Sequence, residues 1–226
     1  MTSNAVRLAS RVADREHVLR GFLDSEKRRV AVACHAMARA FSRGGTLLVF
    51  GTGAAETDAA HVAVEFMHPV IVGKRALPAL APPNDVFALT QPGDIALGLG
   101  DGAKAFVAAA RARGLLTVSF DAGPADFAFA VPTDDPFVRQ EVHETTYHVL
   151  WELVHVFFEH PGLLDDACIT CGDVAVEARV VAVRNGTAVI EKDGLREEVA
   201  VELIDGVGVG DVLLCHAGVA LEKLPR

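Results

Sequence analysis

The sequence has no long uninterrupted apolar stretch and few cysteines. No window approaches the roughly 20 apolar residues that a membrane-spanning helix requires, and the N-terminal segment MTSNAVRLASRVADREHVLR is charged throughout, unlike a signal peptide. Four scattered cysteines in 226 residues are too few for a disulfide framework. Because 51% of the residues are hydrophobic, we expect a soluble cytoplasmic protein with a well-packed core.

Basic residues are also scarce. The net charge is -9, with 15 basic and 18 acidic residues in the first 160 positions and 6 and 12 after them. An acidic surface repels a phosphate backbone, so the composition argues against a nucleic-acid partner. The sequence also contains no internal repeat and no low-complexity tract.

The first 160 residues show alternating helical and strand-like segments. Apolar spacing predicts helix over residues 4–43, with Asp24-Ser25 as a candidate break between two helices. A buried strand at 46–50 runs into a glycine-rich turn and a helix that carries His61 and Glu65. Further strands are predicted at 95–99, 116–120 and 128–131, and further helices at 103–113 and 136–160. This alternation predicts an α/β fold with a parallel sheet covered by helices.

The composition changes after residue 160. Pro161-Gly162 ends the last helix, and residues 161–166 are typical of a linker between domains. Strand-like segments follow at 175–183, 187–191, 196–201 and 212–216, separated by Asn-Gly and Asp-Gly turns. We therefore predict two domains, residues 1–160 and 167–226, the second of them a small all-β, OB-like barrel.

Two helices carry candidate metal ligands. His61 and Glu65 are one helical turn apart, so their side chains point the same way and suit a divalent metal or an acid/base pair. Such a pair is, however, most often a solvated helix face. On the helix at 136–160, a polar row that includes Gln140, Glu144 and His148 adjoins an apolar stripe. This pattern is typical of a cleft at the rim of a core, and also of a solvated helix edge.

Several other residues have plainer interpretations. We expect His143 and His155 on the helix surface, and Trp151 in the core or in a subunit interface. Cys34 is expected to be buried within its helix, and Cys215 to face the barrel core.

Four segments carry a family resemblance: GTGAAETDAAHVAVEF, RALPAL at 75–80, GDIALGL at 93–99 and RQEVHETTYHVLWELV at 139–154. Together they resemble the phosphoheptose isomerase branch of the sugar isomerase (SIS) superfamily. The resemblance implies a SIS-type three-layer fold, a homo-oligomer (dimer or tetramer) and a small-molecule ligand in a cleft. It also implies a zinc site formed by His61, Glu65, Gln140 and His148. In a ketose–aldose isomerisation of this kind, Glu65 would be the base and His148 the acid.

The phosphate-binding features of that family are altered here. The family uses a Ser in the first glycine-rich turn and a Ser/Thr-rich loop, STSGNS; this chain has Ala55 and the shorter loop GLGDGAKAF at 98–106. The expected substrate-binding positions are Gly51, Gly53, Ala55, Asp101 and Lys104. Asp101 adds negative charge, and each lost anion contact costs about 1–3 kcal/mol. We therefore expect the metal site to be retained without the ordinary phosphosugar substrate.

The C-terminal part has a second resemblance. ACITCGDVAVEARVVAV and REEVAVELIDGVGVGDVLLCHAGVALEKL, within residues 167–224, resemble the HypC/HupF hydrogenase-maturation chaperones. The resemblance implies that Cys168, together with His216, binds iron with cyanide and carbonyl ligands. The partners it implies are a maturation scaffold protein and the large subunit of a [NiFe]-hydrogenase. Cys168 is internal here, whereas the family cysteine normally follows the initiator Met.

Three functional hypotheses follow from these two resemblances. The first is a hydrogenase-maturation protein that joins a metal-binding SIS-like domain to an iron-carrying chaperone domain. The second is a zinc-dependent isomerase of sedoheptulose 7-phosphate with an accessory tail. The third is a SIS domain that serves only as a non-catalytic platform for oligomerisation.

Overall fold

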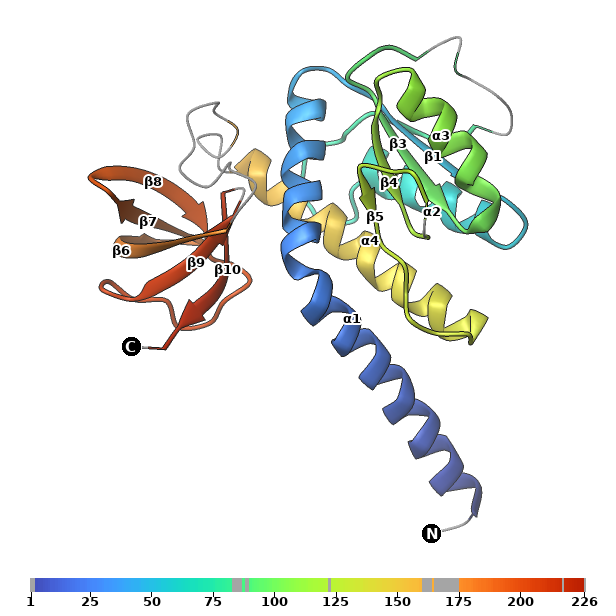
Figure 1. The fold of residues 1–226 in the computed structure, drawn as a ribbon, viewed down its shortest axis with the longest axis horizontal. Helices are drawn as coiled ribbons and strands as arrows, with labels where there is room; N and C mark the ends of the chain where they lie inside the picture. Colours follow the sequence, from blue (N-terminus) through green and yellow to red (C-terminus); the bar gives the residue numbers. More distant parts are fainter. Residues whose placement is uncertain are drawn as a thin grey trace.

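The computed structural model describes residues 3–82, 87, 90–121, 123–159, 164, 175–216 and 218–225, with side chains from Leu8 onward. A helix-covered parallel sheet precedes Glu159, and a β-barrel follows from Val176 (Figure 1). Of the predicted linker at 161–166, only Leu164 lies within the described residues.

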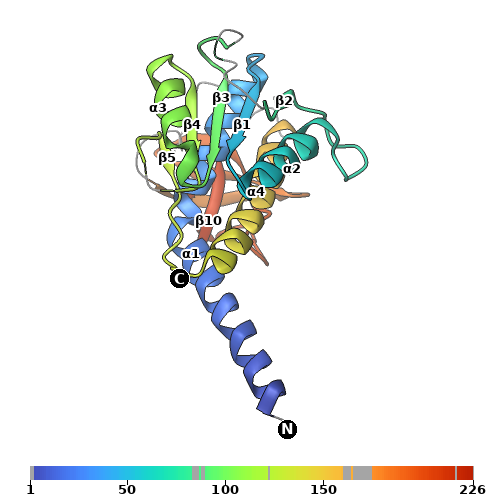
Figure 2. The same cartoon turned by 90° about the vertical axis from the view of Figure 1, so that its right-hand side faces the viewer.

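The chain begins with one long helix, α1 (Ser3–Ser42), of 40 residues. The predicted break at Asp24-Ser25 is wrong, because the helix is continuous there. Within it, the Ser25 hydroxyl donates a 2.8 Å hydrogen bond to the Phe22 carbonyl. The N-terminal half projects away from the sheet, while the C-terminal half is buried from Val30 to Phe41 (Figure 2). None of the described helices combines the length and apolar composition needed to cross a membrane.

The predicted parallel sheet is confirmed. Its strands are β1 (Leu47–Gly51), β2 (Ala79–Leu80), β3 (Ile95–Leu99), β4 (Leu116–Ser119) and β5 (Phe127–Ala128). All neighbours pair in parallel in the order β2-β1-β3-β4-β5. Sequence patterning did not predict the two-residue strand β2, and it overestimated the length of β5. Every residue of β3 is buried, as expected for a central strand covered on both faces.

Helices cover the two faces of the sheet unequally. The other helices of this part are α2 (Ala55–Met67), α3 (Lys104–Ala112), which follows the 3-10 turn η2 (Asp101–Ala103), and α4 (Pro136–Glu159). Leu47 and Val49 of β1 share a core with α1, α2 and α4, whereas Leu48 packs with α3. This alternation follows from the two-residue period of a strand, and it gives the three-layer arrangement.

The C-terminal strands form the predicted barrel. They are β6 (Val176–Arg184), β7 (Thr187–Lys192), β8 (Leu195–Ala200), β9 (Val212–His216) and β10 (Val219–Leu224), closed in the order β10-β8-β7-β6-β9. Asn185-Gly186 and Asp193-Gly194 make the tight turns at both ends of β7, where Asp193, Gly186 and Gly194 have positive φ. Strand β10 was not predicted.

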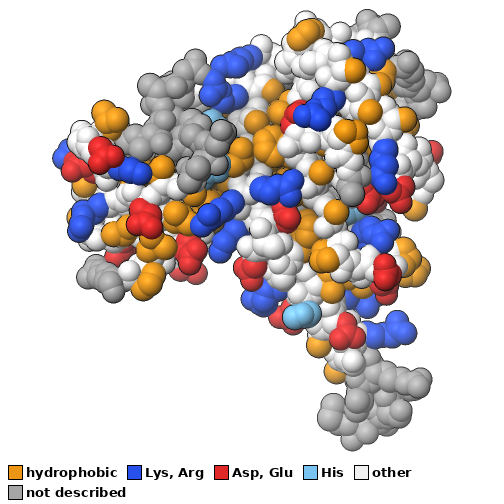
Figure 3. All heavy atoms as spheres, in the orientation of Figure 1, with side chains coloured by type: hydrophobic (Ala, Val, Ile, Leu, Met, Phe, Trp, Pro, Cys, Tyr) orange, Lys and Arg blue, Asp and Glu red, His pale blue; other side chains and the backbone are white. Residues whose placement is uncertain are grey.

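The barrel packs against α1. Ala200, Val219 and Leu221 belong to the same apolar cluster as the buried part of α1, and Lys27 lies 4.0 Å from Glu222. Helix α1 therefore stands between the barrel and the sheet (Figure 1). On the face drawn in Figure 3, acidic and basic side chains are interspersed over both parts.

The turn between β1 and α2 tolerates no side chain at Gly51. A Cβ there would lie 2.2 Å from the Ala55 carbonyl oxygen, in the first turn of α2. We predict that Gly51→Ala lowers the free energy of unfolding by about 2 kcal/mol or more, because backbone must move. In the control Gly21→Ala, the new methyl meets nothing within 4 Å, and removing a helical glycine should stabilise by about 0.5–1 kcal/mol. Denaturant titrations measure both, and equal stability of Gly51→Ala and the parent chain would contradict this account.

Candidate metal centre and the adjoining cavity

Three ring side chains of α4, spaced four residues apart, hold α2 and the loop after it. The Tyr147 hydroxyl lies 3.1 Å from Nδ1 of His61, and the Trp151 indole donates a 2.9 Å hydrogen bond to the Glu65 carbonyl. His155 Nε2 lies 2.9 Å from the Arg75 carbonyl. A spacing of four residues puts all three rings on one side of the helix, so α4 fixes the position of α2 along its length.

His61, Glu65 and His148 meet between the two helices. One carboxylate oxygen of Glu65, Oε1, lies 3.2 Å from Nε2 of His61 and 3.2 Å from Nε2 of His148. The potential ligand atoms of the three residues all lie within 4.8 Å of one another, and no other such group occurs among the described residues. The structure thus brings together three of the four residues that the sequence predicted as ligands of the zinc site.

The two distances to Glu65 are compatible with a tetrahedral ion. Ligands bound about 2.0–2.2 Å from zinc at tetrahedral angles are roughly 3.3–3.6 Å apart, close to the 3.2 Å between Glu65 Oε1 and each histidine Nε2. The Glu65 side chain is 14% exposed, while those of His61 and His148 are 41% and 40% exposed. The carboxylate therefore forms the floor and the two rings form the rim of a site that is open to solvent on one side.

Gln140, the fourth predicted ligand, lies against Asp58, one turn before His61 on α2. Its amide nitrogen is 3.2 and 3.3 Å from the two carboxylate oxygens of Asp58. This contact engages the donor end of the amide, whereas the carbonyl oxygen is the end that could bind a metal. Sequence patterning missed Asp58, although its spacing of three residues from His61 places it on the same side of α2.

Burial, together with the charges of Glu144, Asp58 and Glu65, raises the pKa of Tyr147 well above its usual range. The phenol therefore stays protonated at neutral pH and acts as a neutral hydrogen-bonding partner of His61. Sequence patterning missed this residue too. The repeat of polar-tipped rings at Tyr147, Trp151 and His155 is the signal that could have revealed it.

Next to the cluster is a cavity of about 290 Å³ at the carboxyl ends of β3 and β4, the end of a parallel sheet where ligands bind. The described residues that line it include Asp58, Asp101, Asp121 and Arg139. Three carboxylates thus face one guanidinium, and that guanidinium also donates a 2.7 Å hydrogen bond to the Thr133 carbonyl. The charge of the lining disfavours a phosphate dianion.

The predicted substrate-binding positions are distributed over this region. Ala55 and Asp101 line the 290 Å³ cavity, and Gly51 lines a neighbouring one of about 370 Å³. Gly53 turns the chain between β1 and α2 with a φ of 61°. Lys104 forms an ion pair with Asp101, and its hydrogen bond and charge lower the pKa of that carboxyl. The lysine that could have received an anion is therefore already paired.

His143 lies in the wall of the 290 Å³ cavity and is only 7% exposed, so the prediction of a surface position is wrong. Its ring packs edge-on against Phe120, and its Nε2 has no hydrogen-bond partner among the described residues. Burial, with a smaller contribution from the charge of Arg139, lowers the pKa of His143 to about 4. His155 is also buried, at 1% exposure, with the Trp151 carbonyl 2.8 Å from its Nδ1 and the Arg75 carbonyl 2.9 Å from its Nε2.

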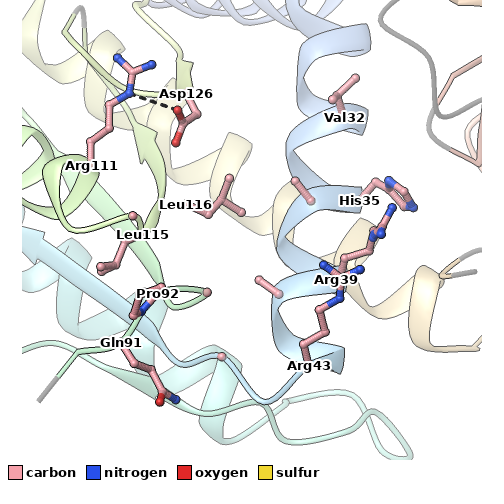
Figure 4. A pocket seen from close by; sticks show the side chains of 15 residues that line it. Val32, His35, Arg39, Arg43, Gln91, Pro92, Arg111, Leu115, Leu116 and Asp126 are labelled. Carbon is pink, nitrogen blue, oxygen red and sulfur yellow. Dashed lines mark hydrogen bonds and ion pairs between the residues drawn. The ribbon is translucent and has the colours of Figure 1, made fainter. Parts of the chain in front are cut away.

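A larger cavity, of about 810 Å³, lies at the opposite, amino ends of the strands (Figure 4). Arg39 and Arg43 extend into this region from the end of α1, and Arg111 lies 3.2 Å from Asp126 across the opening. None of the predicted metal ligands lines this cavity, so its volume gives no information about the metal centre.

The predicted cysteine positions were partly confirmed. Cys34 and Cys215 are fully buried, the latter in the barrel core, where burial and the charge of Glu197 raise its pKa to about 12. His216, the next residue, is 7% exposed and pairs with Val219, so alternation directs it to the barrel face that packs toward α1. Cys168 and Cys171 lie outside the described residues.

Known relatives share most of the first part of the chain. The phosphoheptose isomerase of Solidesulfovibrio magneticus is 33% identical over 193 residues, covering 70% of this chain and 94% of the relative. The chain belongs to the phosphoheptose isomerase family. The enzyme of Thermodesulfovibrio yellowstonii is 31% identical over 159 residues, covering 56% and 79% of the two chains. The SIS domain family matches residues 12–118 of this chain, and the HupF/HypC family matches residues 174–226. The chain is thus a fusion of a phosphoheptose isomerase-like SIS domain with a HupF/HypC region.

Solved structures show the same fold for the SIS domain. A phosphoheptose isomerase from Francisella tularensis superposes with a TM-score of 0.60 at 21% identity, covering 69% of this chain and all of that one. The Neisseria gonorrhoeae enzyme gives 0.58 at 19% identity, covering 67% and 98%. At these identities the likeness establishes the fold and leaves the chemistry to the residues of this chain.

The buried imidazole of His143 predicts a pH-dependent stability. Its folded-state pKa of about 4 lies below the unfolded value of about 6.5, so the unfolded chain takes up the proton first. The free energy of unfolding should therefore fall by about 2 kcal/mol between pH 7 and pH 5 because of this histidine alone. Denaturant titrations at several pH values should show a shallower dependence for His143→Phe, whereas His17→Gln, at an exposed site on α1, should keep the parent slope. Identical slopes for all three proteins would refute the assignment.

Proposed function

We propose that this protein takes part in the maturation of a [NiFe]-hydrogenase, with a metal-binding SIS domain tethered to a barrel that carries iron. The observation behind this proposal is the fusion itself, which joins an isomerase-family domain to a HupF/HypC region in one chain. A tether raises the effective concentration of whatever one domain binds or makes near the other. The proposed domain boundaries are residues 1–160 and 167–226.

In the SIS domain, the proposed ion is zinc. The ligands would be His61, Glu65 and His148, with the Gln140 carbonyl oxygen as the fourth, because nitrogen and oxygen donors of this kind suit zinc. When bound, zinc would polarise a carbonyl group of the ligand. In this proposal Glu65 and His148 are the groups that move protons, and the sequence resemblance supports the same roles.

The proposed ligand of this domain carries no phosphate. The lining of the cavity beside Gln140 holds three carboxylates against one guanidinium, and Lys104 is paired with Asp101. Bringing a dianion to such a lining costs like-charge repulsion. A small uncharged carbonyl or polyol compound suits the cavity better.

In the barrel, the proposed cargo is iron with cyanide and carbonyl ligands, held by Cys168 and His216. Thiolate and imidazole are both good iron ligands. The proposed partners are a maturation scaffold protein and the hydrogenase large subunit. We also propose that the chain forms a dimer or tetramer through the SIS domain.

A genetic test separates the role of the barrel from that of the SIS domain. In a host whose hydrogenase depends on this protein, Cys168→Ala should abolish hydrogenase activity, because the cargo loses its thiolate ligand. The infrared bands of cyanide and carbonyl should disappear from the complex purified with the maturation partner. Cys171→Ala is the matched control and should keep most of the activity. Full activity of Cys168→Ala without any partner binding would reject the maturation role.

An assay with sedoheptulose 7-phosphate tests the isomerase alternative. We expect the zinc-loaded protein to show no turnover, because the lining of the cavity repels the phosphate. Turnover that disappears in Glu65→Gln but persists in Glu144→Gln, an exposed carboxylate of α4, would instead establish the second hypothesis. A metal analysis that finds no zinc would support the third hypothesis, a non-catalytic platform, and full zinc occupancy that is lost in His61→Ala would count against it.

A further inference from the structure

The hydroxyl of Tyr147 contacts Nδ1 of His61. Nδ1 is the ring nitrogen that faces away from the cluster. The two atoms are 3.1 Å apart, and Tyr147 is only 1% exposed. Its ring meets the His61 ring edge-on at 5.7 Å and the His148 ring at 4.8 Å. One buried phenol therefore touches both histidines of the cluster.

A histidine that binds a metal through Nε2 must carry its proton on Nδ1, and the partner of Nδ1 fixes both the tautomer and the plane of the ring. Nε2 of His61 lies 3.2 Å from Glu65 Oε1, which accepts hydrogen bonds and cannot donate one when ionised. In the metal-free cluster, a neutral His61 ring beside an ionised Glu65 would donate from Nε2 to Glu65 and accept the Tyr147 hydroxyl hydrogen at Nδ1. When Nε2 instead binds an ion, Nδ1 carries the proton and donates it to the Tyr147 oxygen.

We propose that Tyr147 is a positioning residue that holds the His61 ring with Nε2 toward Glu65 and His148, whether or not an ion is bound. The inference rests on the proposed metal-binding role of the cluster. A hydroxyl can serve both states because it donates in one and accepts in the other, whereas a carboxylate in this position would satisfy only the second.

The need for such a contact follows from the exposure of His61. Its side chain is 41% exposed on α2, so the ring has room to rotate away from the cluster. Tyr147 comes from α4, the helix that also supplies His148, and the bond from Trp151 to the Glu65 carbonyl fixes α4 against α2. The hydroxyl thus ties the rotation of one ligand to the helix that carries the other.

The test compares Tyr147→Phe with Thr146→Val in the full-length chain. The first removes one oxygen and keeps the ring; the second removes a buried hydroxyl whose partner is the Val142 carbonyl and which has no described contact with His61. Competition with a chromophoric chelator measures zinc affinity, and nitrogen-15 NMR of the histidine rings in the metal-free protein reports the state of Nδ1. Tyr147→Phe should bind zinc about tenfold or more weakly, as is usual when such a supporting contact is lost.

In metal-free Tyr147→Phe, the Nδ1 resonance of His61 should move to the position of a nitrogen without a hydrogen bond, and thermal unfolding should confirm that the variant is folded. Thr146→Val should match the parent in zinc affinity and in the His61 resonances. Parent-like affinity of a folded Tyr147→Phe variant would overturn this inference and leave the metal site intact. If the parent chain binds zinc no better than His61→Ala, both the metal site and the role of Tyr147 are rejected.

Discussion

The packing of α4 against α2 is the interaction on which the candidate site depends. It is made by hydrogen bonds from ring side chains to the partner helix and the loop after it, through Tyr147, Trp151 and His155. These polar ring atoms are buried, so leaving any of them unpaired would cost about 1–3 kcal/mol. The helices are therefore held in one alignment, and that alignment brings His148 to within 3.2 Å of Glu65.

Two neighbouring regions of the SIS domain differ in their chemistry. The cluster of His61, Glu65 and His148 keeps a geometry suited to an ion, while the lining beside it has three carboxylates and a single guanidinium. An ion bound in the cluster would add positive charge close to Asp58. The metal-free lining lacks this charge. The electrostatics of the cavity and the occupancy of the cluster are therefore coupled.

The barrel is joined to the SIS domain by an apolar contact as well as by the chain. Ala200, Val219 and Leu221 share a hydrophobic cluster with α1, so the long helix serves both parts of the protein. Helix α2 lies on the sheet side of α1 and the barrel lies on the other (Figures 1 and 2). Among the described residues, α1 therefore lies between His216 of the barrel and the core of the SIS domain.

The sequence by itself determined the fold class, because strand and helix periods of two and 3.6 residues are written directly into the order of apolar residues. The spacing of four residues placed His61 and Glu65 on one face of a helix, and the family resemblance, not the spacing, implied that these two residues bind a metal together with Gln140 and His148. Only the tertiary structure decided what covers each face. Helical spacing is the same for a solvated row and a buried one, so His143 and His155 were wrongly predicted to lie on the surface. The contacts of Tyr147, Trp151 and Asp58 depend on how α4 packs against α2, which spacing within one helix does not determine. For the same reason α1 is continuous through Asp24-Ser25: a polar pair permits a helix break, and the surrounding packing decides whether the chain makes one.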